Sequence, residues 1–478
     1  MKNLTYDAVV VGSGPNGLAG AITLANAGLS VLILEAKETI GGGLRSAELT
    51  LPGYIHDVCS AVHPLGASSP FFASLPLSVY GLEWIQPAIP LAHPFDDGSA
   101  ALLKRSIAET SLTLGSDAKA YQDLMAPLVE SWDAIKYDIL APFRFPKHPL
   151  AMLRFGILGI RSAAGLVNSR FDEGRAKALF GGLAAHSILP LDKPLTAAFG
   201  LILGILGHAV GWPIPKGGSQ KIADALKDYF LKLGGEIVTS FPVASMADLP
   251  KAKIYLLDVT PRQLIQIAGD LLPSGYVNKL KNYRYGPGVF KIDWALSQPI
   301  PWRNAECHKA GTVHLGATFE EIRKSENEIW EGRPADVPYI ILAQPSLFDP
   351  TRAPPGKHTA WAYCHVPHAS TADMTAKIEA QIERFAPGFK DCILAKSCKS
   401  PLELEKYNPN YIGGDINGGV QDLYQLFTRP TKSLAPYTTP VKGLYICSSS
   451  TPPGGGVHGM CGYHAAKVAL DVLSRPGC

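Results

Sequence analysis

The chain has 478 residues, of which 46% are hydrophobic and 18% charged, and its formal net charge is +3. This length predicts two domains with substantial cores, and so small a positive charge excludes a protein that binds nucleic acid by neutralising phosphates. The eight cysteines form no C-x-x-C pair and no zinc-like spacing with histidine, and the first residues lack a signal-peptide pattern. We therefore expect reduced thiols, no metal site and a cytoplasmic protein.

The segment from Tyr6 to Glu35 predicts one β-α-β unit, because two apolar runs flank a glycine-rich turn and an apolar-periodic helix. The turn, Gly12-Ser13-Gly14-Pro15-Asn16-Gly17, fits G-x-G-x-x-G. Such glycines permit a tight turn, backbone approach to a pyrophosphate and close packing of helix on strand. Glu35 closes the second strand, where a carboxylate accepts hydrogen bonds from ribose hydroxyls. The unit is therefore predicted to bind a dinucleotide.

A second glycine-rich bend, Gly41-Gly42-Gly43, follows Glu35 and leads to Arg45. Arg45 is predicted to reach the pyrophosphate as a charge-assisted donor. No second G-x-G-x-x-G follows a strand later in the chain, so a separate domain for NAD(P)H is not expected. The cofactor is then a single dinucleotide held by two phosphate contacts.

The middle of the chain predicts two alternating domains. Residues 72–215 are mostly helical with Pro-rich joints, and residues 284–425 alternate short β-like runs with turns and one helix near Asp373 to Phe385. Between them, a Gly-rich turn, an amphipathic helix and two strands resume the first pattern and end at Asp258. We expect an α/β protein with a Rossmann-type domain assembled from three segments (1–71, 216–283 and 426–478) and an inserted α+β substrate domain (72–215 and 284–425).

Near the C-terminus, Thr451 to Gly459 forms a Gly-rich loop before a helix that begins at about Met460. A helix N-terminus at this place can stabilise negative charge on a bound cofactor. The segment GLYICSSSTPPGGGVHGMCGYHAA resembles the C-terminal flavin motif of the phytoene-dehydrogenase-like branch of the FAD amine-oxidase superfamily, and the E-x5-GG-x-x-R-S pattern resembles FAD flavoproteins of the glutathione-reductase-2 type. WPIPKGGSQKIADAL and YGPGVFKIDWAL also resemble that branch, so the resemblance covers nearly the whole chain.

The resemblance implies a set of FAD-binding residues, in which Val243 contacts the adenine through its backbone and the last three lie near phosphate or flavin. The set is Gly12, Gly14, Pro15, Asn16, Gly17, Glu35, Ala36, Gly42, Gly43, Arg45, Val243, Ser449, Val457 and Met460. One departure is that Cys447 is followed by three serines, where relatives usually show Cys-Gly or Gly-Asp. This departure concerns the ribityl and pyrophosphate contact at Ser448 and Ser449, not the binding of FAD itself.

Dehydrogenation by FAD needs a C–H bond placed near flavin N5, a dry pocket and in some cases a base. His458 is our first candidate for an acid or base and His63 the second; a role in shaping the turn is the alternative for His458. Four further histidines, His186, His208, His365 and His368, are expected to be packed or exposed rather than metal ligands. Tyr54, Trp212, Trp294 and Trp361 are expected either to line an apolar pocket or to lie in the core.

The expected reaction is oxidation of a lipophilic small molecule, similar to an isoprenoid or carotenoid chain, with oxygen or a quinone as electron acceptor. Amine oxidation at a C–N bond, a flavin-dependent isomerisation and a non-catalytic FAD-bearing scaffold remain alternatives. Leu195 to Gly211 is apolar but short for a membrane span. Leu150 to Val167 carries Arg154 and Arg161 among apolar residues, a composition suited either to a peripheral membrane contact or to a buried amphipathic helix.

Overall fold

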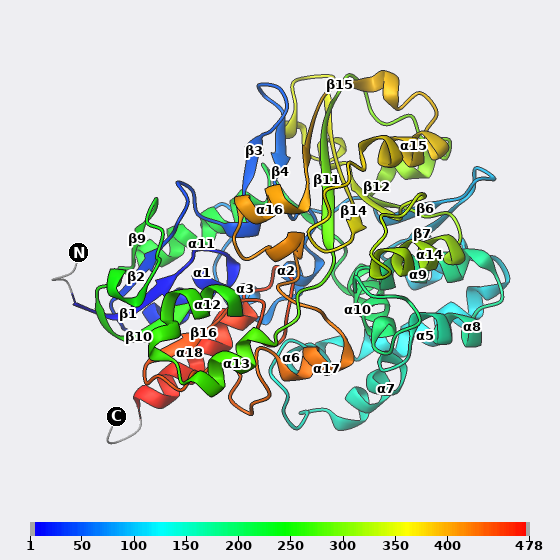
Figure 1. Cartoon of the computed structure of the whole chain (residues 1–478). Helices are drawn as coiled ribbons and strands as arrows, with labels where there is room; N and C mark the ends of the chain where they lie inside the picture. Colours follow the sequence, from blue (N-terminus) through cyan, green and yellow to red (C-terminus); the bar gives the residue numbers. More distant parts are fainter. Residues whose placement is uncertain (1–4, 475–478) are drawn as a thin grey trace.

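The computed structural model describes residues 5–474 and contains two large sheets (Figure 1). The first sheet is parallel, with the strand order β16-β10-β1-β2-β9. Its strands are β1 (Thr5–Val11), β2 (Val31–Leu34), β9 (Glu236–Val238), β10 (Lys251–Leu257) and β16 (Leu444–Ile446). All five strands come from the three segments assigned to the Rossmann-type domain, and the α/β fold class is confirmed.

Helices cover both faces of this parallel sheet, as expected for strands such as β2 that are buried along their whole length. One apolar core lies between the sheet and α1 (Pro15–Asn26), α11 (Gln220–Lys232) and α18 (Met460–Leu473). The other lies beneath α12 (Pro261–Ala268) and α13 (Ser274–Lys281). The glycine-rich turn between β1 and α1 therefore lies at the carboxyl edge of the sheet, where dinucleotides bind in doubly wound folds.

The second sheet is mixed, with the strand order β15-β11-β14-β13-β12-β6-β7. Its strands are β6 (Ile89–Pro94), β7 (Ala100–Leu103), β11 (Gly288–Leu296), β12 (Ala310–Leu315), β13 (Ile340–Ala343), β14 (His358–Val366) and β15 (Ile393–Lys399). Two small ribbons accompany it, β3 (Ser46–Glu48) with β4 (Ile55–Asp57), and β5 (Trp84–Ile85) with β8 (Ile214–Pro215). The seven strands all come from the two segments assigned to the substrate domain; its exact boundaries stay a prediction.

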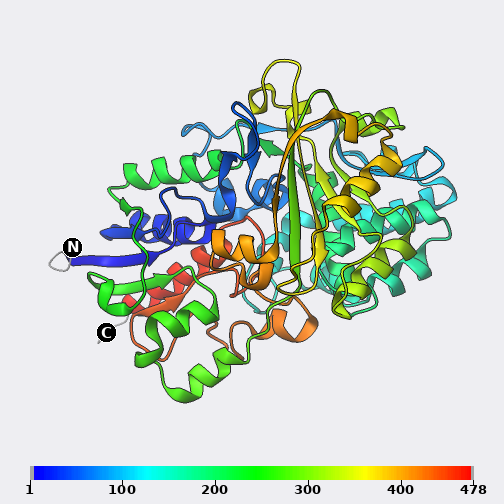
Figure 2. The ribbon, with the colours of Figure 1, turned by 45° about the horizontal axis from the view of Figure 1, so that its top comes forward.

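The two faces of the second sheet differ in character. On β11, Phe290, Ile292 and Trp294 face a dry core with α15 (Thr375–Phe385), whereas Lys291 and Asp293 face the opposite side. That opposite side looks toward the helices of residues 107–209, and Figure 2 shows the long strands standing between the parallel-sheet half and these helices. The remaining helices are α2 (Pro64–Ser68), α3 (Pro70–Ala73), α4 (Ile107–Ser111), α5 (Ala118–Glu130), α6 (Trp132–Ile139), α7 (Pro149–Gly159), α8 (Ala163–Arg170), α9 (Gly174–Ala185), α10 (Thr196–Ala209), α14 (Phe319–Trp330), α16 (Pro401–Tyr407) and α17 (Leu423–Thr428).

The two stretches considered for membrane contact differ in their exposure to solvent. α10 carries the apolar stretch from Leu195 to Gly211 and is mostly buried in the helical core. Within residues 5–474 no single helix is both long and apolar enough to span a membrane; α7 and α8 meet that test only together, and they are bent by 96° where they meet. α7 turns an apolar face outward, with Leu150, Leu153 and Ile157 exposed.

Candidate functional site

A cavity of about 550 Å³ extends from the glycine-rich turn after β1 to the inner face of the second sheet. Most of the residues predicted to bind FAD line it, as does His63. They are Gly12, Gly14, Pro15, Asn16, Glu35, Ala36, Gly42, Gly43, Arg45, Val243, Ser449 and Val457. Gly17, Met460 and His458 do not line the cavity. Contact of each residue with FAD stays a prediction.

The turn after β1 has no room for side chains at its glycines. Gly12 has φ of 99°, which favours glycine. A Cβ at Gly17 would lie 2.0 Å from the carbonyl oxygen of Gly12, so only glycine permits this approach of helix to strand. Gly14 caps α1, whose first turn carries no acidic side chain. The backbone amides and the dipole of α1 therefore remain suited to an anion.

Glu35 and Arg45 form a buried ion pair beside this turn, with 3.1 Å between Arg45 Nη2 and Glu35 Oε1. The same carboxylate accepts hydrogen bonds from the Ser13 backbone N–H at 2.9 Å and the Ser13 hydroxyl at 2.5 Å. Arg45 also donates to the Thr39 carbonyl and stacks on the Tyr407 ring, 5.4 Å from its centroid. The predicted ribose acceptor and phosphate donor are thus held rigidly by one another.

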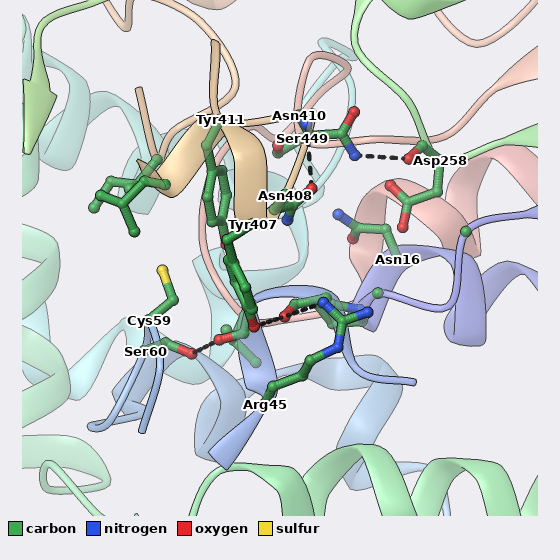
Figure 3. Close-up of a pocket in the computed structure, with 18 of the residues that line it drawn as sticks. Asn16, Arg45, Cys59, Ser60, Asp258, Tyr407, Asn408, Asn410, Tyr411 and Ser449 are labelled. Atoms are coloured by element: carbon green, nitrogen blue, oxygen red, sulfur yellow. Dashed lines mark hydrogen bonds between the residues drawn. The ribbon is translucent and has the colours of Figure 1, made fainter. Parts of the chain in front are cut away.

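An unpartnered acceptor at this end of the cavity fits a hydroxyl or N–H donor of a dinucleotide. The side-chain oxygen of Asn16, at the start of α1, is buried without a hydrogen-bond partner, and a buried amide of this kind needs a ligand or water. Asp258, at the end of β10, accepts a hydrogen bond from the Gly17 N–H at 2.9 Å. Burial, and then the charge of Glu35, raise the pKa of Asp258 to about 7. Figure 3 shows Asn16 and Asp258 on the same side of the pocket.

The segment around α16 closes the middle of the cavity and was missed by the sequence analysis. Tyr407 donates from its hydroxyl to the Gly42 carbonyl at 2.9 Å, and Asn410 donates to the Asp258 carbonyl at 2.9 Å. The rings of Tyr407 and Tyr411 stand in the centre of the pocket in Figure 3. No motif marks this segment in the sequence, because its role depends on contacts with residues more than 150 positions away.

His63 lies in the cavity wall. Its Nε2 is 2.8 Å from the Ser219 hydroxyl, which itself donates to the Ser60 carbonyl at 2.6 Å. His63 Nε2 therefore carries the proton, and Nδ1 is a buried lone pair without a partner. Burial lowers the pKa of His63 to about 4, so the ring is neutral.

His458 is buried away from the cavity wall. Its Nδ1 accepts a hydrogen bond from the Met460 backbone N–H at 3.0 Å, and its carbonyl accepts one from the Ser69 hydroxyl at 2.6 Å. The ring caps the start of α18, and burial lowers its pKa to about 4. This placement favours the role of shaping the turn over the acid or base role that we assigned to it first.

At the sheet end the wall is mainly apolar and aromatic. Trp212 and Trp361 line the cavity, which is one of the two positions we expected for the four aromatic residues. Trp294 lies on the opposite face of the second sheet and donates to Glu379, and Tyr54 does not line the cavity. Lys291 also lines this end, with its ammonium over the Trp361 ring and paired with the buried carboxylate of Asp293. The remaining lining residues from this region are His186, Leu203, Val289, Thr312, Ile341, Ala343 and Tyr363.

Three comparisons bear on the family. The model of a NAD(P)-binding Rossmann-like domain matches residues 10–75. Pyridine nucleotide-disulfide oxidoreductase domain-containing protein 2 from Mus musculus is 26% identical, with 98% of this chain and 94% of that protein covered. The lycopene-forming phytoene desaturase of a Paracoccus species is 22% identical over 98% of this chain and 97% of the relative.

A solved structure of putrescine oxidase superposes with a TM-score of 0.63 at 17% identity, covering 99% of this chain and all of that one. The second, mixed sheet beside the Rossmann sheet is therefore shared with an amine oxidase. Over nearly its whole length this chain is similar to flavoproteins of the phytoene desaturase-like kind, and it shares its fold with a solved amine oxidase. The resemblance drawn from the sequence motifs is confirmed, and the flavoprotein belongs among the flavin-dependent oxidoreductases.

Proposed function

We propose that this flavoprotein uses FAD to dehydrogenate a lipophilic small molecule of isoprenoid or carotenoid-like character. The observation that carries the proposal is the continuity of the cavity, which joins the dinucleotide turn to an apolar wall on the second sheet. Bound FAD supplies a hydride acceptor at N5. A phytoene desaturase among the relatives supports a long apolar substrate.

Different residues of the chain then bind the cofactor and orient the substrate. The amides at the start of α1 and the glycines before it bind the pyrophosphate, and Glu35, fixed by Ser13 and Arg45, accepts from the ribose. Leu203, Ile341 and Ala343 exclude water and orient the chain of the substrate. We propose oxygen or a quinone as the acceptor of the electrons.

Amine oxidation is less well supported by the aromatic residues. Trp361 and Tyr363 contact each other edge to face, with ring centroids 5.2 Å apart, and do not form two parallel walls. The Lys291 ammonium already lies over Trp361, 5.6 Å from its centroid. This face of Trp361 is therefore already covered by Lys291, which is paired with Asp293, and is not free to hold a substrate ammonium. The geometry thus favours a neutral substrate.

The proposal is tested by the cofactor. The purified protein is expected to be yellow and to release free FAD at about one equivalent per chain on acid precipitation, because no covalent link is needed to hold a dinucleotide in this cradle. Anaerobic addition of a lipophilic substrate should bleach the flavin. A colourless protein that releases NAD contradicts the assignment of FAD, and FAD that no substrate or isomerisation assay engages would support the scaffold alternative.

We also propose that the substrate is taken from an anionic membrane surface at a patch around α7. Leu150 is 82% exposed and Phe145 85% exposed, and exposed apolar groups gathered in this way mark interaction surfaces. Basic side chains lie among them. The α7 patch comprises the exposed residues Phe143, Arg144, Phe145, Lys147, Leu150, Leu153, Arg154, Ile157 and Ile160.

A further inference from the structure

His186 occupies a position at the sheet end of the cavity that its sequence surroundings did not predict. It directly follows α9 and lines the cavity, although we expected it to be packed or exposed. Its ring lies edge-on to Trp212, with centroids 6.0 Å apart. Its Nε2 is 3.1 Å from Nε2 of His314 on β12. Two histidines 128 positions apart are thus joined by one hydrogen bond.

The two rings differ in what their second nitrogens meet. Nδ1 of His314 is buried and has no partner within the described chain. Nδ1 of His186 also makes no hydrogen bond to any described residue, but it is not enclosed by protein atoms. Since His186 lines the cavity, this nitrogen is a hydrogen-bonding atom presented to the cavity.

The direction of the hydrogen bond between His186 and His314 decides whether Nδ1 of His186 is a donor or an acceptor. Both rings are neutral, because burial lowers the pKa of His186 to about 3 and the pKa of His314 well below its ordinary value. Buried N–H groups without an acceptor are rarer than unpaired lone pairs. The proton of His314 is therefore assigned to Nε2, from which it is donated to His186 Nε2. His186 must then carry its own proton on Nδ1, so it presents a neutral N–H donor.

The surroundings of this donor are apolar. Leu203, Trp212, Ile341 and Ala343 line the same end of the cavity. The Thr312 hydroxyl, two residues before His314 on the same face of β12, is buried without a partner. A polar donor in a mainly apolar wall fixes the orientation of one polar group on an otherwise apolar ligand.

We propose that His186 binds a neutral oxygen acceptor, a carbonyl or hydroxyl oxygen, on the substrate, so that the substrate is an oxygen-bearing lipophile and not an unfunctionalised hydrocarbon or an amine. This inference rests on the proposed function and narrows its substrate class. His314 is a positioning residue, because it sets the tautomer of His186 without reaching the ligand.

Infrared spectroscopy of a bound probe tests the proposal on the holoprotein. The probe is 2-undecanone with a ¹³C-labelled carbonyl, with undecane as the hydrocarbon of equal length. In the wild type the carbonyl stretch of the bound ketone should lie below its position in hexane, because it accepts a hydrogen bond. In His186→Phe and His186→Gln it should move back to the hexane position. The Gln amide can replace Nε2 and reach His314, but it leaves no group at the position of Nδ1. The Asn amide in His186→Asn replaces Nδ1 instead, so the carbonyl band should stay lowered in that variant.

Binding constants give the second readout. The ratio of the Kd for 2-undecanone to that for undecane should rise about three- to tenfold in the Phe and Gln variants, as for loss of one neutral hydrogen bond, and stay within about twofold in the Asn variant. FAD content and melting temperature check that each variant folds. An unshifted band in the wild type, no ketone binding, or equal losses in the Gln and Asn variants overturns the inference. These outcomes are distinct from failure of the proposed function, which appears as wild-type protein without FAD.

Discussion

At the scale of single residues, Asp258 is a buried carboxyl whose negative charge is poorly compensated. It is buried beside Glu35, and its folded pKa of about 7 lies above the ordinary value of 3.8. The folded state therefore holds the proton more tightly than the unfolded state. The resulting penalty is absent below about pH 4, grows as the pH rises and is complete above about pH 7.

Replacing this carboxyl by an amide should remove the penalty. In Asp258→Asn the amide oxygen still accepts from the Gly17 N–H, and the stability gained over the wild type should grow by about 3 kcal/mol between pH 5 and pH 8. Urea unfolding across this range measures it. The exposed Asp270→Asn serves as the control and should show no such trend. A constant difference between Asp258→Asn and the wild type would show that Asp258 stays ionised throughout.

His458 is the second residue whose role can be separated experimentally. Loss of its hydrogen bond from Met460 in His458→Ala should cost about 0.5–2 kcal/mol, as for loss of a helix cap, and should weaken retention of the flavin. In His458→Ala molecules that keep FAD, the substrate should reduce the flavin at nearly the wild-type rate. Stopped-flow reduction of reconstituted protein measures this rate. Full flavin content with reduction slowed by about 10²- to 10⁴-fold would restore His458 as an acid or base.

At the scale of elements, α7 and α10 show why apolar content alone does not locate a membrane contact. α10 is the more apolar helix, yet it is enclosed by α5, α7 and α9 in the core. α7 uses Phe155 and Gly159 to face that core, while Leu150, Leu153 and Ile157 recur on the outer face at helical spacing. Of the two, only α7 presents an apolar face to solvent.

The α7 patch should bind anionic liposomes at low salt and release them at high salt, because each basic residue contributes about 1 kcal/mol near an anionic surface. Leu153→Ser combined with Ile157→Ser should lower the bound fraction in a flotation assay. The control pair Leu231→Ser with Leu271→Ser removes exposed apolar side chains elsewhere and should bind as the wild type does. Protein that stays soluble with both anionic and neutral lipids at low salt would rule out this membrane contact.

At the scale of the whole molecule, the site exists because the chain leaves the parallel sheet and returns to it twice. The parallel sheet supplies the turn of Gly12 to Gly17, and the mixed sheet supplies the wall around Trp361. The segment of α16 lies over the junction and bonds to Gly42 and Asp258. Neither sheet alone encloses a cavity that can hold both a dinucleotide and a second molecule.

The sequence by itself determined the features that depend on neighbours within a few positions. The glycines of the turn, the strand before them and Glu35 after the second strand are a local pattern. Motif resemblance added the family and most of the cavity-lining residues at the dinucleotide end. These predictions hold because backbone sterics and side-chain periodicity act over short distances along the chain.

Only the tertiary structure decided which distant residues meet. The pairing of His63 with Ser219, the position of Tyr407 over Arg45 and the bond between His186 and His314 join segments that share no local signal. The same is true of His458, which its glycine-rich loop suggested as an acid or base but whose ring accepts a hydrogen bond at the start of α18. The physical reason is that burial and hydrogen-bond partners depend on how the two sheets and their helices pack, and the same residue type in the same local pattern can face either the cavity or the core.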